Sequence, residues 1–355
     1  MKCFGCKNTN DKIGILIAQL GTPKSPTAKD LRPYLREFLG DRRVIEKPRI
    51  LWWLILNLII LVIRPKRSAR LYKRIWTSEG SPLLVFTKSL TSKLQNEFKS
   101  IDSNIEVSFG MRYGEKKYRI ETAIDDLLEK GCKRILLFNM YPQYSATTTA
   151  SNYDSFFKHL LKRRYVPTVK VVEPYYDHPE YIEALTTMIN EEYSKYDKRP
   201  QKLVLSYHGI PQEYVVKGDP YCCQCVSTTK ALEKKLNFEK DEIIHTFQSR
   251  SGRDPWLQPY TDYTIDELPE KGIKDIAVFA PGFPTDCLET LDELGNEASE
   301  PFHEAGGETL RLIPCLNDHP RWIEAMKNII LEELGSWLDD KKKLTFASFS
   351  CPSKL

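Results

Sequence analysis

The sequence has no apolar run long enough to cross a bilayer. Its longest, Ile50–Ile63, has fourteen residues and one polar member, whereas a membrane-spanning helix needs about 20. The net charge of the 355-residue chain is only +4, too small to indicate nucleic acid as a partner. No secretory signal stands before the nine cysteines, because Met1 to Asn10 is polar. These absences, with the odd number of cysteines, predict a cytoplasmic protein whose thiols are free or metal-bound.

A histidine stands at the end of one apolar segment. Leu203–Leu205 is typical of a buried strand, and Gly209 and Pro211 stop it soon afterwards. His208 is therefore expected just beyond the carboxyl end of a core strand, the edge at which open α/β sheets bind ligands. A histidine held in an ordinary turn is the structural alternative.

Three pairs of segments match one another in the same order along the chain. They are residues 15–23 with 203–211, residues 124–138 with 265–279, and Phe109, Arg112 and Gly114 with Phe247, Arg250 and Gly252. In the second pair nine of fifteen positions are identical, and in the first pair Leu20 falls at the position of His208. We therefore predict an α/β fold of two similar Rossmann-like halves, each a mostly parallel sheet flanked by helices. An active-site cleft should separate the halves, with Leu20 and His208 on opposite walls.

The boundaries of the predicted parts follow from these matches. They are a cysteine-containing segment at 1–11, a first half at 12–165, a second half at 166–320 and a tail at 339–355. A C-terminal helix at 321–338 is expected to complete the first half.

An acidic segment follows the predicted strand at 276–280. Asp286 suits the N-cap of a helix, and Glu289 stands three residues on, as in a capping box. At about 100° per residue, Asp286, Glu289, Glu293 and Glu297 would share one helix face. That face is either solvated or, if it lies in the cleft, a path for cations or protons that begins near His208.

The apolar run Ile50–Ile63 is followed directly by a cationic cluster. Its members are Arg64, Lys66, Arg67, Arg70, Lys73 and Arg74. A buried core helix is the structural alternative. Apolar surface beside cations, with Trp52 and Trp53 at the junction, favours peripheral contact with an anionic membrane. We expect the run to form a lip that also walls an apolar pocket.

Three motifs carry a resemblance to one family. They are Ser206-Tyr207-His208-Gly209-Ile210-Pro211 with Gly218-Asp219-Pro220-Tyr221, Gln248-Ser249-Arg250 with Pro255-Trp256-Leu257, and Asp286-Cys287-Leu288-Glu289-Thr290-Leu291. They resemble the signatures of the ferrochelatases, and the similarity runs from about Ile13 to Trp337. The resemblance implies that ferrous iron is inserted into protoporphyrin in a cleft between two Rossmann-like halves, giving haem and releasing two protons. It also implies a monomer or homodimer at the inner-membrane surface.

The resemblance assigns roles to individual residues. It implies that His208, Glu289 and Glu293 are catalytic and that His208 and Glu289 contact the iron. The porphyrin-binding residues that it implies are Leu20, Ser81, Arg112, Tyr144, Trp256 and Phe283. Cys287 stands where some relatives have a histidine. A coproporphyrin enzyme, a chelatase for cobalt or a sirohaem precursor, and a non-catalytic haem or metal carrier remain the alternatives.

The cysteines suggest a separate hypothesis. Some ferrochelatases hold a [2Fe-2S] cluster with one internal cysteine and three near the C-terminus. Here Ala146 stands at the internal position and the tail has only Cys351, so that arrangement cannot form. Another set of thiols could hold a cluster in its place: Cys3, Cys6, Cys222, Cys223 and Cys225.

Overall fold

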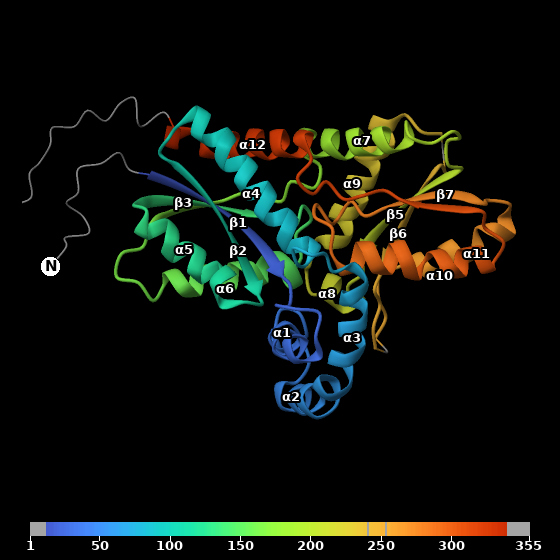
Figure 1. Ribbon diagram of the computed structural model, residues 1–355, viewed down its shortest axis with the longest axis horizontal. Helices are drawn as coiled ribbons and strands as arrows, with labels where there is room; N and C mark the ends of the chain where they lie inside the picture. The colour runs from blue at the N-terminus through green and yellow to red at the C-terminus, as the bar shows by residue number, and fades with distance from the viewer. Residues whose placement is uncertain (1–11, 240, 253, 339–355) are drawn as a thin grey trace, which may run out of the picture.

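The computed structural model describes residues 12–239, 241–252 and 254–338 (Figure 1). Its strands form two four-stranded sheets with the orders β2-β1-β3-β4 and β6-β5-β7-β8, and neighbouring strands are parallel throughout. The strands are β1 (Lys12–Gly21), β2 (Ile105–Tyr113), β3 (Cys132–Asn139), β4 (Thr168–Val171), β5 (Lys202–His208), β6 (Ile243–Gln248), β7 (Asp275–Phe279) and β8 (Thr309–Leu312).

Helices connect the strands and cover both faces of each sheet (Figure 1). Those up to the end of the first sheet are α1 (Ala28–Gly40), α2 (Arg49–Ile55), the π-turn η1 (Leu56–Ile60), α3 (Leu61–Ile75), α4 (Pro82–Ile101), the 3-10 turn η2 (Lys116–Tyr118), α5 (Ile120–Glu129), the π-turn η3 (Ala146–Ala150) and α6 (Ser151–Leu160). The later ones are α7 (Pro179–Tyr193), α8 (Gln212–Val216), α9 (Tyr221–Leu236), α10 (Thr261–Glu267), the 3-10 turn η4 (Pro269–Lys271), the π-helix η5 (Glu289–Glu297), α11 (Ser299–Glu304) and α12 (Pro320–Leu334).

The predicted duplication is confirmed by the matching strand order of the two sheets. The register of the central strands agrees as well, since Ile17 pairs with Phe138 and the equivalent Leu205 pairs with Phe279. The strands of the third matched pair, β2 and β6, do not pair with their central strands in the same register: the pairing differs by two residues between the halves. Phe109 pairs with Ile17, whereas Phe247 pairs with Tyr207. A shift of two keeps every side chain on its face of the sheet, so the apolar pattern could not reveal it.

The first sheet extends beyond the expected boundary at residue 165. β4 pairs with β3 from Thr168 to Val171, so this strand belongs to the first half and not to the second. Its four residues are exposed or only partly buried. A short edge strand of this kind has a weak apolar signal, which is why the sequence placed the join too early.

The two halves share one apolar core. A single buried cluster includes residues of both sheets together with α4, α7, α9 and α12. Trp322 of α12 is completely buried, and its ring lies 5.5 Å from that of Tyr181 on α7 and 6.5 Å from that of Phe138 on β3. The C-terminal helix therefore packs against both halves (Figure 1), and the two sheets are held in a fixed relation.

The apolar run lies in a separate lobe formed by α1, α2, η1 and α3, which projects from the sheets (Figure 1). We call residues 28–75 the lip lobe. It has its own small core, which includes Leu35, Leu56 and Tyr72. Among the described residues, no helix is long and apolar enough to cross a membrane. Most of the run instead faces outward, and Ile50 (82%), Trp53 (60%), Leu58 (64%) and Ile63 (66%) are well exposed.

Replacing Trp322 with alanine should destabilise the whole chain, because it opens a cavity where both halves pack. We expect the free energy of unfolding to fall by about 3–5 kcal/mol, measured by urea denaturation. The matched substitution at exposed Leu161 (80%) should change it by less than about 0.5 kcal/mol. A similar small change for Trp322→Ala would contradict the shared core.

Candidate active site

His208 is the last residue of β5 and is partly buried. Its Nδ1 lies 2.6 Å from the backbone oxygen of Gly209. A carbonyl oxygen can only accept, so Nδ1 carries the hydrogen in this contact. The Nε2 atom of the neutral ring therefore keeps its lone pair and can accept a proton or bind a metal.

The backbone after His208 passes close to its neighbours. A Cβ atom at position 209 would lie 2.9 Å from the backbone oxygen of Gln248 and 3.3 Å from the Trp256 ring, so only glycine fits without a shift. The Phe283 ring lies 6.3 Å from the imidazole. Of the predicted pocket aromatics, Phe283 therefore lies beside the histidine and Trp256 beside the glycine that follows it.

The acidic segment does not form the predicted α-helix. Residues Glu289–Glu297 are a π-helix, so the spacing of 100° per residue does not apply. Asp286 precedes this helix and is buried, where it accepts hydrogen bonds from Thr290 Oγ1 (2.8 Å) and Asn317 Nδ2 (2.6 Å). The capping box was wrong because Asp286 contacts these side chains instead, and Asp286 shares no open face with Glu289.

Glu293 lies within electrostatic reach of both His208 and Glu289. Burial raises the pKa of Glu293 and the charge of Glu289 raises it further, while a hydrogen bond from Ser249 and the charge of His208 oppose this. Gln248 fixes the start of the helix, because its Nε2 donates to the backbone oxygen of Glu289 at 2.8 Å. The Glu293 carboxylate is therefore coupled electrostatically to both the His208 imidazole and the Glu289 carboxylate.

The first half supplies the opposite wall. The Tyr141 hydroxyl accepts a hydrogen bond from the backbone N–H of Leu20 at 2.9 Å. Burial raises the pKa of both Tyr34 and Tyr141, and the charge of Glu289 adds to the effect. The π-helix therefore faces residues of the first half, and the site lies between the two halves.

Comparison with known proteins identifies the family. The ferrochelatase family model matches residues 12–334. The chain belongs to the ferrochelatase family. It is 45% identical over 331 residues to the ferrochelatase of Marinobacter nauticus, covering 93% of this chain and 89% of that one. It is 47% identical over 328 residues to the ferrochelatase of Idiomarina loihiensis, covering 92% and 89%.

Solved structures support the same fold. SirB from Bacillus subtilis, determined with Fe3+, superposes with a TM-score of 0.53 at 12% identity, covering 92% of this chain and 98% of that one. The sirohydrochlorin chelatase SirB from Bacillus subtilis subspecies spizizenii, in complex with cobalt, gives 0.51 at 12% identity, covering 94% and 98%. Two Rossmann-like halves are therefore confirmed, and this ferrochelatase is a metal-insertion enzyme that adds iron to a porphyrin.

Three of the predicted porphyrin contacts are engaged within the ferrochelatase itself. Ser81 is buried and accepts a hydrogen bond from Thr22 Oγ1 at 2.8 Å. The Arg112 Nη2 atom lies 2.7 Å from a carboxylate oxygen of Asp41. Tyr144 is partly buried, and its backbone N–H donates to Gln224. The structure places none of the three in contact with His208.

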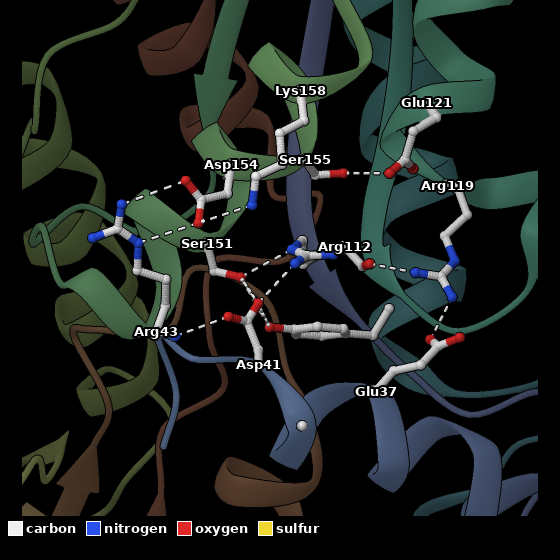
Figure 2. Close-up of polar contacts among 12 residues, drawn as sticks. Glu37, Asp41, Arg43, Arg112, Arg119, Glu121, Ser151, Asp154, Ser155 and Lys158 are labelled. Atoms are coloured by element: carbon white, nitrogen blue, oxygen red, sulfur yellow. Dashed lines mark hydrogen bonds and ion pairs between the residues drawn. The ribbon is translucent and has the colours of Figure 1, made fainter. Parts of the chain in front are cut away.

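The environment of Arg112 is a polar network that the sequence did not indicate (Figure 2). Asp41, at the end of α1, accepts hydrogen bonds from the Arg112 guanidinium, the Tyr113 hydroxyl, the Ser151 hydroxyl and the backbone N–H of Arg43. Although burial opposes it, these bonds lower the pKa of Asp41. The network fastens the lip lobe to β2 and α6. Its partners are far apart in sequence, so no local pattern could have revealed it.

The cysteine hypothesis gains no support from the described residues. No group of three histidine, cysteine, aspartate or glutamate side chains in that part of the chain could hold a metal ion. Cys225 is buried and Cys223 is exposed on the same helix, α9, and burial raises the pKa of Cys225, which opposes the thiolate form that ligation needs. Cys3 and Cys6 lie outside the described residues.

The raised pKa of Glu293 predicts a pH-dependent gain from Glu293→Gln. A carboxyl whose pKa is raised on folding costs stability once the pH exceeds its unfolded value, ordinarily 4.5. The melting temperature of Glu293→Gln should therefore exceed that of wild type at pH 7.5, and the gain should vanish at pH 4. Glu300→Gln, at an exposed position, should show no gain at either pH. A gain for Glu293→Gln that is equal at both pH values would contradict this origin.

Proposed function

We propose that this ferrochelatase inserts ferrous iron into protoporphyrin at the site formed by His208, Glu289 and Glu293. The observation that carries the proposal is the unshared Nε2 lone pair of His208, within electrostatic reach of Glu293, whose carboxylate also interacts with that of Glu289. Insertion removes two protons from the pyrrole nitrogens as the iron enters. His208 can accept one of them, and burial, which raises the pKa of Glu293, makes this carboxylate a better proton acceptor than an exposed one.

The same groups suit the metal. Imidazole nitrogen and carboxylate oxygen are ordinary ligands of divalent iron, and His208 and Glu289 are the proposed contacts of the incoming ion. Glu293 lies farther along the helix and receives a hydrogen bond from Ser249, so we assign it to proton removal. Ferrous iron is a substrate in this scheme.

The walls of the site are suited to holding a flat apolar ring. The proposed porphyrin contacts on these walls are Phe283 beside His208, Trp256 beside Gly209, and Leu20 on the first half. Binding energy from contacts remote from the pyrrole nitrogens can be used to bend the ring, so that its lone pairs point towards the metal. Ser81 and Arg112 would bind porphyrin only after exchanging contacts that their side chains now make with the protein, whereas Tyr144 is held through its backbone N–H.

Protoporphyrin is proposed over more acidic tetrapyrroles because the lip lobe exposes so much apolar surface. Coproporphyrin carries two additional carboxylates, and a sirohaem precursor carries more. Neither needs an apolar lip. The test is to measure insertion of ferrous iron into protoporphyrin, coproporphyrin and sirohydrochlorin. The rates show which of the three is the substrate, and a non-catalytic carrier would insert iron into none of them.

His208→Ala should abolish insertion of iron into protoporphyrin while porphyrin binding stays close to that of wild type. The variant loses the Nε2 acceptor but none of the apolar walls. Initial rates and fluorescence titration with protoporphyrin measure the two effects. His303→Ala, at an exposed histidine of α11, is the matched control and should insert iron normally. Near-normal turnover by His208→Ala would overturn the assignment.

We also propose that the lip lobe binds the surface of an anionic membrane. Exposed Ile63 lies on α3 with the basic residues that follow it, and exposed Trp53 lies on α2 of the same lobe. Apolar insertion and attraction to anionic headgroups would act on one surface, as in interfacial helices.

Trp53→Glu should weaken binding to vesicles that contain phosphatidylglycerol by about tenfold or more, because it places a charge in the apolar contact. Leu161→Glu makes the same change at an exposed leucine outside the lobe and should bind as wild type does. Vesicle co-sedimentation gives both values. Equal binding by the two variants would show that the lobe is not the contact.

The iron–sulfur cluster remains a separate hypothesis. Its ligands would have to combine Cys3 and Cys6 with cysteines of α9. Iron and sulfide analysis of anaerobically purified protein tests it, and a protein that contains neither would reject it.

A further inference from the structure

One arginine of the lip lobe holds the π-helix η5 at two positions. Arg74, in the last turn of α3, binds Asp292 through Nε (2.8 Å) and Nη2 (2.8 Å), and its Nη2 also lies 3.1 Å from Glu297. The Asp292 side chain is only 2% exposed, whereas those of Arg74 and Glu297 are 45% and 49% exposed. A buried carboxylate thus depends on a cation from another part of the chain.

The spacing of the two acids matters. Asp292 and Glu297 are five residues apart. In an α-helix, which turns about 100° per residue, they would lie about 140° apart around the axis. In a π-helix the hydrogen bond runs from residue i to i+5, so residues five apart follow one another on nearly the same side. One guanidinium can therefore hold both carboxylates in the π-helix but not in an α-helix.

The residues of the proposed chemistry lie on this same helix. Glu289 is its first residue, and Glu293 lies between the two acids that Arg74 holds. Leu288 and Leu291 pack against the apolar cluster of the lip lobe, while Leu294 is buried in the second half. The position of the carboxylates thus depends on contacts from two separate parts of the molecule.

We propose that Arg74 is a positioning residue that keeps residues 289–297 π-helical and so sets Glu289 and Glu293 relative to His208. The expected effect on iron insertion rests on the proposed function, whereas the expected effect on the π-helix does not.

The test uses variants that keep the protein folded. Arg74→Gln alone removes the only cation that the described residues place on the buried Asp292 and leaves this carboxylate with the hydrogen bond from Asn296 Nδ2 (3.0 Å), which puts folding at risk. The double variant Arg74→Gln with Asp292→Asn removes both charges, and Glu297→Gln removes only the second contact. Arg36→Gln, at an exposed arginine of α1 in the same lobe, is the matched control.

Hydrogen exchange of the amides of residues 289–297 and steady-state insertion of iron into protoporphyrin are measured for each variant. In the double variant, exchange should be about tenfold faster than in wild type, since the contact between Arg74 and Asp292 that holds the segment is lost. Its kcat should fall by about tenfold, with KM for protoporphyrin within about twofold, because misplaced groups affect the reacting geometry more than binding. Glu297→Gln should change both quantities in the same direction by less, and Arg36→Gln should change neither.

Unchanged hydrogen exchange in the folded double variant would overturn the proposal that Arg74 holds residues 289–297. Faster exchange with unchanged kcat would overturn the positioning role. A wild-type protein that inserts no iron would refute the proposed function alone, because the exchange measurements would still decide whether Arg74 holds the π-helix.

Discussion

The packing of both sheets against one apolar core is the constraint on which the rest of this structure depends. Trp322, Tyr181 and Phe138 meet where the halves join, so β1 and β5 cannot move independently. Their carboxyl ends carry Leu20 and His208. Parallel strands place loops at one edge, and the shared core fixes the distance between the two edges. A site built between independently packed domains would lack this fixed geometry.

Polar contacts then attach the less tightly packed parts to this frame. The lip lobe has a small core of its own, against which Leu288 and Leu291 of the second half also pack. The Asp41 network fixes the end of α1 to the first half, and Arg74 fixes the end of α3 to the π-helix of the second. Both attachments bury a carboxylate. Because an unpaired buried carboxylate is costly, each attachment is strongly favoured while its partners stay in reach.

The fold could be predicted from the sequence because its signals are local and repeated. The apolar run at Ile13–Leu16 and the segment Leu203–Leu205 both mark buried strands, and the duplicated segments supported one another. The motif around His208 identified the family before any geometry was known. The difference of two residues in the register of the strand that carries Phe247 could not be predicted, because a shift of two leaves the alternation of side chains unchanged.

The parts that could not be predicted depend on contacts between distant residues or on a choice of helix type. Asp41 and Arg112 are 71 residues apart in the chain, and only the folded structure joins them. Residues 289–297 contain nothing that distinguishes a π-helix from an α-helix locally; the contact with Arg74 lies outside the segment. The capping box predicted at Asp286 was wrong for a related reason, because Asn317, one of the partners of this carboxylate, is distant in sequence. Local rules fail here beside the proposed chemistry, which is where proteins commonly depart from them.

The partner of His208 Nδ1 is a main-chain oxygen, that of Gly209, and this affects how the site can evolve. In sites where a carboxylate orients a histidine, a single codon change can remove the orienting group. Here every amino acid at position 209 would carry the same oxygen. A point mutation at position 209 therefore cannot remove the orienting oxygen; because only glycine fits there without a shift, it can affect the tautomer only by displacing the backbone.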